Sequence, residues 1–539
     1  MIKHVSLLVL MLALVSRAQA EMKLPTILSD HMVLQQKQSD PIWGWDAPGT
    51  KVTVTFAGQT KTAVAGSDGK WMVKLDSMPA SVTPQVVIIT GTSRIEIQDV
   101  LVGEVWVCSG QSNMEFRLGK DPNGDLEAAV SDLPAIRLIT VPPKGCQELL
   151  NDFKGEWKAA TPETARNFSA IGFLCGRYIH QMLHVPVGLI ENHWGGAAAE
   201  AFVPRPAIDR DPRFKRLADS AAKMEAELLP DNGDARFAAG MMAWTNECAK
   251  AKSENKPAPQ KPRRWLQERS RPGNTFGAMV HPILCYGIKG VFWYQGEANA
   301  GRAWEYADLF PFMIEQWRKE WQQGDFPFYW VQLPNYQAEQ AQPKESAWAE
   351  LREAQTRTMK LPNTGQAVII DLGEGKDIHP KNKHDVAPRL ARWALANDYG
   401  IKIPYRSPEF KSLTIRSNTA TVTFDCFGGT LRAFGVEELR GFAICGADKK
   451  WQNAMGRITG TNTVEVWSEN VLQPVALRYA WADNPVCNLY ADNGLPVTPF
   501  RTDDFEWTTK PKPAPIAQTN ASPIKASNPQ SHPVVGDPH

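Results

Sequence analysis

The sequence predicts an α/β protein, with a parallel sheet covered by helices on both faces and flanking β-sandwich-like modules. Residues 104–404 alternate buried apolar runs with segments of helical spacing, as strands joined by crossover helices do. Residues 21–103 instead carry short runs that alternate at period two between turn signals. Residues 405–509 return to that short alternating pattern. We therefore expect a central α/β domain between an N-terminal and a C-terminal β-rich domain.

Apolar runs in the central domain are expected to form the strands of the sheet, and amphipathic segments its covering helices. The predicted strands are 101–108, 185–190, 288–294, 328–333 and 367–372. The predicted helices are 170–183, a segment containing Leu309 and Trp317, and 385–396. In the β-rich domains, period-two or continuous apolar runs predict strands at 52–56, 86–90, 420–424 and 463–467.

A charged insert, residues 205–272, interrupts the central domain. It contains helical stretches and a Pro-rich break at residues 256–262. Two interpretations fit this composition: an excursion over the surface, or a lid over the active site.

The two ends of the chain are expected to lie outside the folded domains. Lys3 and His4 precede an apolar run that ends at Ala18-Gln19-Ala20, which is typical of a secretory signal peptide over residues 1–20. No later apolar run reaches the roughly 18 residues of a spanning helix, so a secreted or periplasmic protein without membrane insertion is expected. The Pro-rich residues 510–539 lack apolar bulk and predict a disordered tail.

Charge and cysteine usage exclude several classes of partner. Without residues 1–20 the chain loses Lys3 and Arg17, so 57 of its 59 basic residues face 58 acidic ones. This balance gives no electrostatic reason to expect nucleic acid. The cysteines are scattered without C-x-x-C pairs, so neither a zinc site nor another metal or cofactor is expected, and their pairing stays open. They stand at positions 108, 146, 175, 248, 285, 426, 445 and 487.

Candidate site residues follow the ends of three predicted strands. Ser112 follows the first strand, Gly195 and Gly196 the second, and Glu297 and Asn299 the third. Ligands of open α/β sheets bind outside the carboxyl ends of the strands, so these groups are expected to meet at one edge. The alternative for Ser112 is a plain helix N-cap.

A histidine close to acidic residues completes a reactive set. His379 lies in a Gly-broken loop with Asp371, Glu374 and Asp377, just before the helix predicted at 385–396. Together with Ser112, this loop offers a nucleophile, a base and a group that orients the base, which are the needs of acyl transfer.

Four sequence blocks surround these candidate residues. They are Gly110-Gln111-Ser112-Asn113-Met114, Trp194-Gly195-Gly196, Trp293-Tyr294-Gln295-Gly296-Glu297-Ala298-Asn299 and Asp377-Ile378-His379-Pro380. These blocks, in this order, resemble the sialate O-acetylesterase family within the SGNH (GDSL-like) hydrolases. The resemblance runs from about Leu24 to Asp504 and implies the three-layer SGNH-like fold for a catalytic domain at 104–404.

The resemblance also implies roles for individual residues. Ser112 matches the nucleophile and His379 the base of the family. The oxyanion is expected on the backbone N–H groups of Ser112 and Gly196 and on the side-chain amide of Asn299. Gln111 and Glu297 are expected to support the neighbouring loops or to bind substrate.

The group that orients His379 is less determined by the sequence. Many SGNH enzymes carry an aspartate three residues before the histidine, where this chain has Lys376. Asp377, two residues before, is the first choice, and a main-chain carbonyl is the alternative. Asp371 and Glu374 are further candidates.

The implied function is that of an exported serine esterase that removes O-acetyl groups from sialic acids or related glycans through an acetyl-serine. A deacetylase of polysaccharides such as xylan and a noncatalytic glycan-binding protein are the alternatives, whereas no carboxylate pair indicates a glycosidase. A sialate carboxylate calls for a cation, for which Arg205, Arg302 and Arg352 are candidates. The sequence indicates no oligomeric state.

Overall fold

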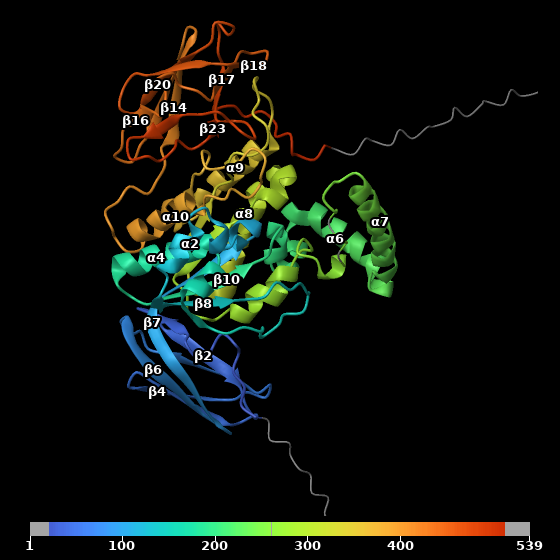
Figure 1. The fold of residues 1–539 in the computed structure, drawn as a ribbon, viewed down its shortest axis with the longest axis vertical. Helices are drawn as coiled ribbons and strands as arrows, with labels where there is room; N and C mark the ends of the chain where they lie inside the picture. Colours follow the sequence, from blue (N-terminus) through green and yellow to red (C-terminus); the bar gives the residue numbers. More distant parts are fainter. Residues whose placement is uncertain (1–20, 260, 263, 513–539) are drawn as a thin grey trace, which may run out of the picture.

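The computed structural model describes residues 21–512 apart from residues 260 and 263. The predicted signal peptide at 1–20, and the predicted tail from 513 onward, lie outside the described residues. Figure 1 shows an N-terminal β-rich part, a middle part with helices around a sheet, and a C-terminal β-rich part, following one another along the long axis.

The middle part is built on strand β7 (Arg94–Gly110), which has neighbours on both sides. Neighbouring strands of this part pair in parallel, except that β9 pairs antiparallel with β8 at one edge. The prediction of an α/β fold with additional β modules is confirmed, but the sheet is mixed rather than wholly parallel. Its order is β13 (Thr364–Ala367), β12 (Phe328–Val331), β11 (Gly290–Tyr294), β7, β10 (Val187–His193), β8 (Leu133–Thr140) and β9 (Lys158–Ala160).

Strand β7 is longer than the predicted 101–108 and runs through the predicted boundary at 103/104. Its first half pairs with the N-terminal strands β6 and β1, and its second half with β10 and β11. Gly103 lies within this strand, and a Cβ there would lie 2.0 Å from the carbonyl oxygen of Pro186. The glycine permits close backbone approach.

Helices cover both faces of the sheet, because buried side chains alternate in direction along each strand. Helices α4 (Ala170–Leu183) and α10 (Lys383–Asn397) pack with Trp106 and Phe292 in one cluster. Helix α8 (Ala303–Trp321) packs on the opposite face with Trp293 and Phe328. The predicted helix 170–183 is confirmed, and that at 385–396 forms the greater part of α10.

Shorter helices fill the connections: α1 (Ser112–Glu115), α2 (Gly124–Ala129), α3 (Pro162–Arg166) and α9 (Ala347–Arg357). Helices α5 (Arg205–Arg210), α6 (Lys215–Leu228) and α7 (Asp234–Ser253) belong to the insert. In Figure 1, α6 and α7 lie to one side of the sheet. Arg216 of α6 pairs with Glu305 of α8 at 2.9 Å, which ties the insert to the helical layer.

The β-rich parts are built from short strands whose side chains alternate between core and solvent. The N-terminal strands are β1 (Val33–Gln35), β2 (Asp40–Trp45), β3 (Lys51–Phe56), β4 (Gln59–Val64), β5 (Lys70–Leu75) and β6 (Ser81–Thr90). The C-terminal strands are β14 (Glu409–Arg416), β15 (Thr419–Asp425), β16 (Leu431–Ala433), β17 (Phe442–Cys445), β18 (Trp451–Asn453), β19 (Met455–Ile458), β20 (Thr463–Trp467), β21 (Ala476–Tyr479), β22 (Leu489–Ala491) and β23 (Phe500–Arg501).

The strand predicted at 367–372 is wrong, because β13 ends at Ala367. Val368 and Ile370 turn into the C-terminal core instead, while Ile369 packs under α10. An apolar run shared between two cores looks like a buried strand in the sequence.

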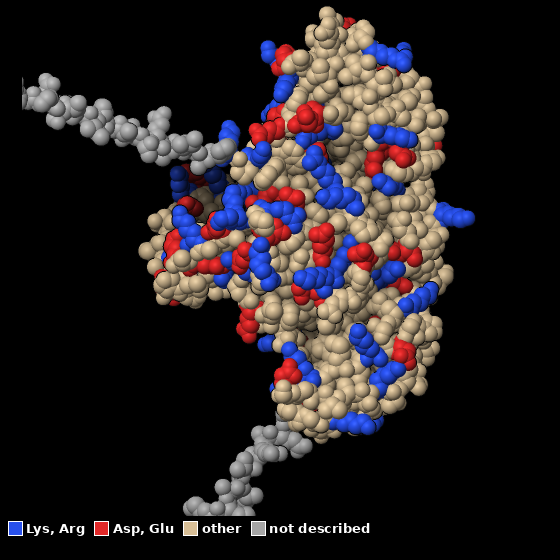
Figure 2. Space-filling view, turned by 180° about the vertical axis from the view of Figure 1, so that it is seen from behind, with Lys and Arg blue, Asp and Glu red and all other residues tan. Residues whose placement is uncertain are grey.

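Basic and acidic side chains are interspersed over the face of the molecule that Figure 2 shows. Among residues 21–512, with 260 and 263 left aside, no helix has the length and apolar character needed to cross a membrane.

Candidate active site

Three strand ends meet at one edge of the sheet, as predicted. His193 of β10 and Tyr294 of β11 both lie opposite Gly110, the last residue of β7. The turns that follow these strands therefore leave the sheet side by side. One turn carries Ser112, and the others carry the Gly195–Gly196 pair and Asn299.

Ser112 is held by a tight turn at the end of β7. Gly110 has a φ of +137°, and a Cβ there would lie 2.2 Å from the carbonyl oxygen of Tyr294, so only glycine fits. The Gln111 N–H donates to that same carbonyl at 3.0 Å. Gln111 occupies the N-cap position of α1 and Ser112 is its first residue. The helix-cap alternative for Ser112 is therefore wrong.

His379 reaches Ser112 from the loop between β13 and α10. Its Nε2 lies 2.8 Å from Ser112 Oγ, although the two residues are 267 positions apart. This distance is within hydrogen-bond range and allows a proton to pass between the two atoms. The serine and histidine that the sequence selected are thus brought together.

Asp377 lies beside the other ring nitrogen of His379. Its Oδ1 is 3.5 Å from Nδ1 and accepts the backbone N–H of His379 at 2.9 Å. The other candidates are engaged elsewhere. Asp371 forms a two-bond pair with Arg389, and Glu374 accepts the backbone N–H of Lys381 at 2.8 Å.

The glycine pair after β10 is packed between charged side chains. A Cβ on Gly195 would lie 3.6 Å from Ser112 Cβ and 2.6 Å from Glu115 Oε2. A Cβ on Gly196, whose φ is +74°, would lie within 2.9 Å of the Arg269 guanidinium. Gly195 places this turn against Ser112. Arg269, which the sequence did not single out, returns from the end of the insert to the same turn.

The Asn299 side chain is buried and fixed by hydrogen bonds on both of its ends. Its Oδ1 accepts from the Ala199 N–H at 3.0 Å and from Gln295 Nε2 at 2.7 Å. Its Nδ2 donates to Glu200 Oε2 at 2.9 Å, and Glu200 pairs with Arg302. The amide orientation is therefore set, with one hydrogen of its NH2 group directed to Glu200.

Gln111 and Glu297 support the loops around Ser112. Gln111 Oε1 accepts the backbone N–H of Ala298 at 3.2 Å, which joins the first turn to the third. Glu297 is partly buried, with its Oε2 atom shielded from solvent, and its Oε1 accepts from Asn113 Nδ2 at 2.5 Å. Burial raises the pKa of Glu297 above its usual range.

The arginines proposed as carboxylate binders have other partners. Arg205 pairs with Asp209 and Glu225, and Arg302 with Glu200 and Glu305. Arg352 is completely buried and donates to the backbone carbonyls of Pro334 and Ala482. The sequence could identify the cations but not their acidic or carbonyl partners.

Three further histidines have partners other than Ser112. The buried His193 lies 3.2 Å from Glu191, and His384 lies 3.2 Å from Glu127. The His281 ring pairs with the backbone carbonyl of Leu150 at 2.7 Å.

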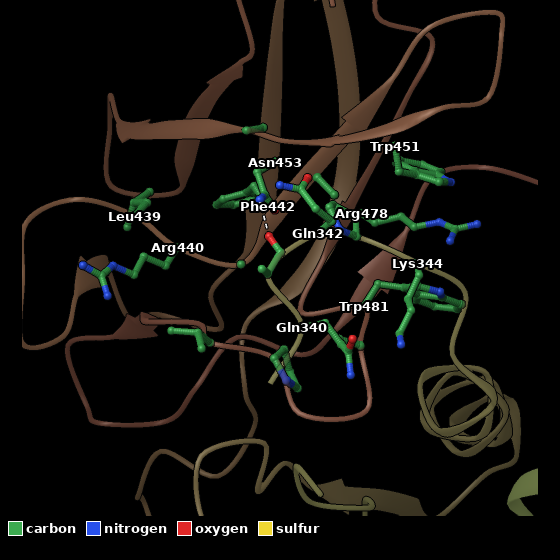
Figure 3. A pocket seen from close by; sticks show the side chains of 18 of the residues that line it. Gln340, Gln342, Lys344, Leu439, Arg440, Phe442, Trp451, Asn453, Arg478 and Trp481 are labelled. Carbon is green, nitrogen blue, oxygen red and sulfur yellow. Dashed lines mark hydrogen bonds between the residues drawn. The ribbon is translucent and has the colours of Figure 1, made fainter. Parts of the chain in front are cut away.

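A cavity of about 310 Å³ lies between the loop that precedes α9 and the C-terminal strands (Figure 3). The Arg478 guanidinium lies over Trp451, 4.1 Å from the ring centroid, and pairs with Asp503 and Glu345. Asn453 donates to the carbonyl of Ala341 at 2.8 Å. Neither Ser112 nor His379 lines this cavity, which lies where the C-terminal part meets the middle part.

Comparison with known proteins decides the family. Residues 263–394 match the family described as carbohydrate esterase, sialic acid-specific acetylesterase. The chain is 31% identical to the sialate O-acetylesterase of Mus musculus over 550 residues, covering 92% of this chain and 97% of that protein. The chain belongs to the sialate O-acetylesterase family. The human sialate O-acetylesterase is 27% identical and covers 88% of this chain.

A solved structure extends the likeness of this family member to the fold. The crystal structure of a carbohydrate acetylesterase from Xanthomonas citri superposes with a TM-score of 0.75 at 36% identity. It covers 90% of this chain, and all of that chain is matched. This member of the sialate O-acetylesterase family is therefore a carboxylic ester hydrolase that acts on acetylated sugars.

Proposed function

We propose that the protein is an exported serine esterase that removes O-acetyl groups from sialic acids through an acetyl-serine. The observation that carries this proposal is the 2.8 Å contact between Ser112 Oγ and His379 Nε2 at the carboxyl edge of the sheet. The helices on both faces support an SGNH-type layering. Export rests on the signal-like residues 1–20.

In this mechanism His379 takes the Ser112 proton as Oγ attacks the acetyl carbonyl carbon. The bond between that carbon and the sugar oxygen breaks, and His379 returns the proton to the departing hydroxyl. Water then attacks the acetyl-serine, giving its proton to His379. Collapse of the second tetrahedral intermediate releases acetate, and Ser112 Oγ regains a proton.

The developing oxyanion is placed on the backbone N–H groups of Ser112 and Gly196 and on the Asn299 amide. Gly195 supports this placement because it lies against Ser112. The chain Arg302–Glu200–Asn299 supports it as well, since it fixes the amide before substrate arrives. Donors held in advance need no reorganisation during the reaction.

Replacing Asn299 by alanine is expected to lower kcat about 10²-fold, the usual cost of losing one oxyanion donor, with KM little changed. Steady-state hydrolysis of 4-nitrophenyl acetate measures both constants. A fall in kcat of less than about threefold would remove Asn299 from the oxyanion site. Thermal unfolding of the variant checks that the buried Glu200 still has a stable environment.

Arg269 supports sialic acid rather than a neutral polysaccharide as the substrate. Its guanidinium lies against Gly196, beside the proposed oxyanion donor, and its Nε lies 4.0 Å from Glu268 Oε2. Guanidinium groups bind carboxylates through two parallel hydrogen bonds, and sialic acid carries a carboxylate that xylan lacks. The name of the relatives from mouse and human supports the same substrate.

Acetate release from O-acetylated sialic acids and from acetylated xylo-oligosaccharides tests this choice. We expect faster release from sialic acids, and Arg269→Gln is expected to raise KM for them by about tenfold, the loss of a charged hydrogen bond. The same variant should leave the xylo-oligosaccharide reaction unchanged. Preference of the wild type for xylo-oligosaccharides would favour the polysaccharide deacetylase, and release from neither would contradict both.

A further inference from the structure

Lys383, the first residue of α10, has a completely buried side chain, and its amino group contacts residues next to Ser112 and His379. Its Nζ donates to Asn113 Oδ1 at 2.7 Å and to the Pro380 carbonyl at 2.6 Å. The rings of Phe116 and Tyr294 lie 4.8 and 5.3 Å from Nζ. A buried cation is costly unless it is paired and hydrogen-bonded, so these partners are what keeps it there.

Asn113 extends this contact to the other side of His379. Its Nδ2 donates to the Ile378 carbonyl at 3.0 Å and to Glu297 Oε1 at 2.5 Å. The carbonyl before His379 is therefore held by Asn113, and the carbonyl after it by Lys383. Because Asn113 follows Ser112 directly in α1, both holds are anchored to the residue next to the nucleophile.

We propose that Lys383 is a positioning residue, which together with Asn113 fixes the main chain on both sides of His379 relative to Ser112. This inference rests on the proposed function, in which His379 is the base for Ser112. Placement of a catalytic group matters steeply, because a displacement of about 1 Å can lower a rate by about 10²-fold.

Burial and the nearby carboxylates act in opposite directions on the charge of Lys383. Burial lowers the pKa of Lys383 to about 7, against the opposing effect of the Glu297 and Asp121 carboxylates. Asn113 hydrogen-bonds both Glu297 and Lys383, and Glu297 Oε2 has no hydrogen-bond partner within the described part of the chain. A purely structural explanation is therefore that Lys383 only balances the partly buried Glu297, and the experiment must separate the two.

The test compares Lys383→Met with the double variant Lys383→Met/Glu297→Gln, which removes both charges while a glutamine oxygen can still accept from Asn113. We expect kcat for 4-nitrophenyl acetate to fall by about 10²-fold in both, with KM changed little, because the hold on Pro380 is lost in each. Recovery of kcat in the double variant would overturn the proposal and leave charge balance as the role of Lys383. The double variant also decides where the single variant fails to fold.

Lys381→Met is the matched control, since Lys381 lies in the loop just before α10 and its side chain is 58% exposed. It is expected to keep kcat within about twofold, as surface substitutions usually do. If kcat of Lys383→Met stays within that range while Ser112→Ala is inactive, the positioning role is contradicted but the proposed function is not. Activity that survives in Ser112→Ala contradicts the proposed function instead.

Discussion

Ser112→Ala is expected to lower kcat for acetate release by at least about 10³-fold, leaving only the rate that binding and oxyanion donors supply. The hydroxyl is the group that lies 2.8 Å from His379 Nε2, and alanine removes it without changing the shape of the α1 turn. Hydrolysis of 4-nitrophenyl acetate and release of acetate from acetylated sugars both measure the loss.

The control for this variant is Ser67→Ala, an exposed turn serine of the N-terminal part, which is expected to leave kcat unchanged. Covalent labelling by an organophosphonate gives a second readout. Wild type and Ser67→Ala are expected to be labelled at Ser112, whereas Ser112→Ala is not. Full activity in Ser112→Ala, or labelling at another serine, would contradict the assignment of the nucleophile.

Much of the site could be predicted because its geometry follows from the topology of parallel strands. Runs such as 185–190 and 288–294 end in polar turns, and parallel strands place those turns at one edge. Ser112 and Asn299 could therefore be expected at one edge of the sheet. The same applies to helix 170–183, whose apolar spacing gave its bounds as the structure has them.

The supporting contacts could not be predicted, because they join segments with no local pattern in common. Lys383 looks like an ordinary surface lysine in a charged loop, yet its side chain is buried against Asn113, 270 positions away. Arg269 belongs to an insert whose composition does not indicate that this residue lies against Gly196. The strand prediction for the apolar run after Ala367 is wrong for a related reason, since hydrophobic periodicity alone does not tell into which of two cores each side chain packs.

His379→Ala is expected to lower kcat as strongly as Ser112→Ala, by at least about 10³-fold, since each removes one partner of the same proton transfer. Asp377→Asn is expected to cost less, about 10- to 100-fold. A buried aspartate that orients such a histidine can be worth about 10⁴-fold, but the Asp377 side chain is 42% exposed, so water screens its charge. Its Oδ1 also remains as an acceptor for the His379 N–H in the asparagine variant.

Glu374→Gln is the matched control for Asp377→Asn, because it neutralises an acid of the same loop whose oxygen accepts the Lys381 N–H. It is expected to keep kcat within about threefold, since glutamine retains an acceptor at this partly exposed position. If kcat of Asp377→Asn falls by less than about tenfold while His379→Ala is inactive, the charge of the Asp377 side chain contributes little. The site is then a Ser112–His379 dyad. The orientation of the His379 ring then depends on the main chain. The hydrogen bonds from Asn113 and Lys383 to the residues that flank His379 become the more important determinant of catalysis.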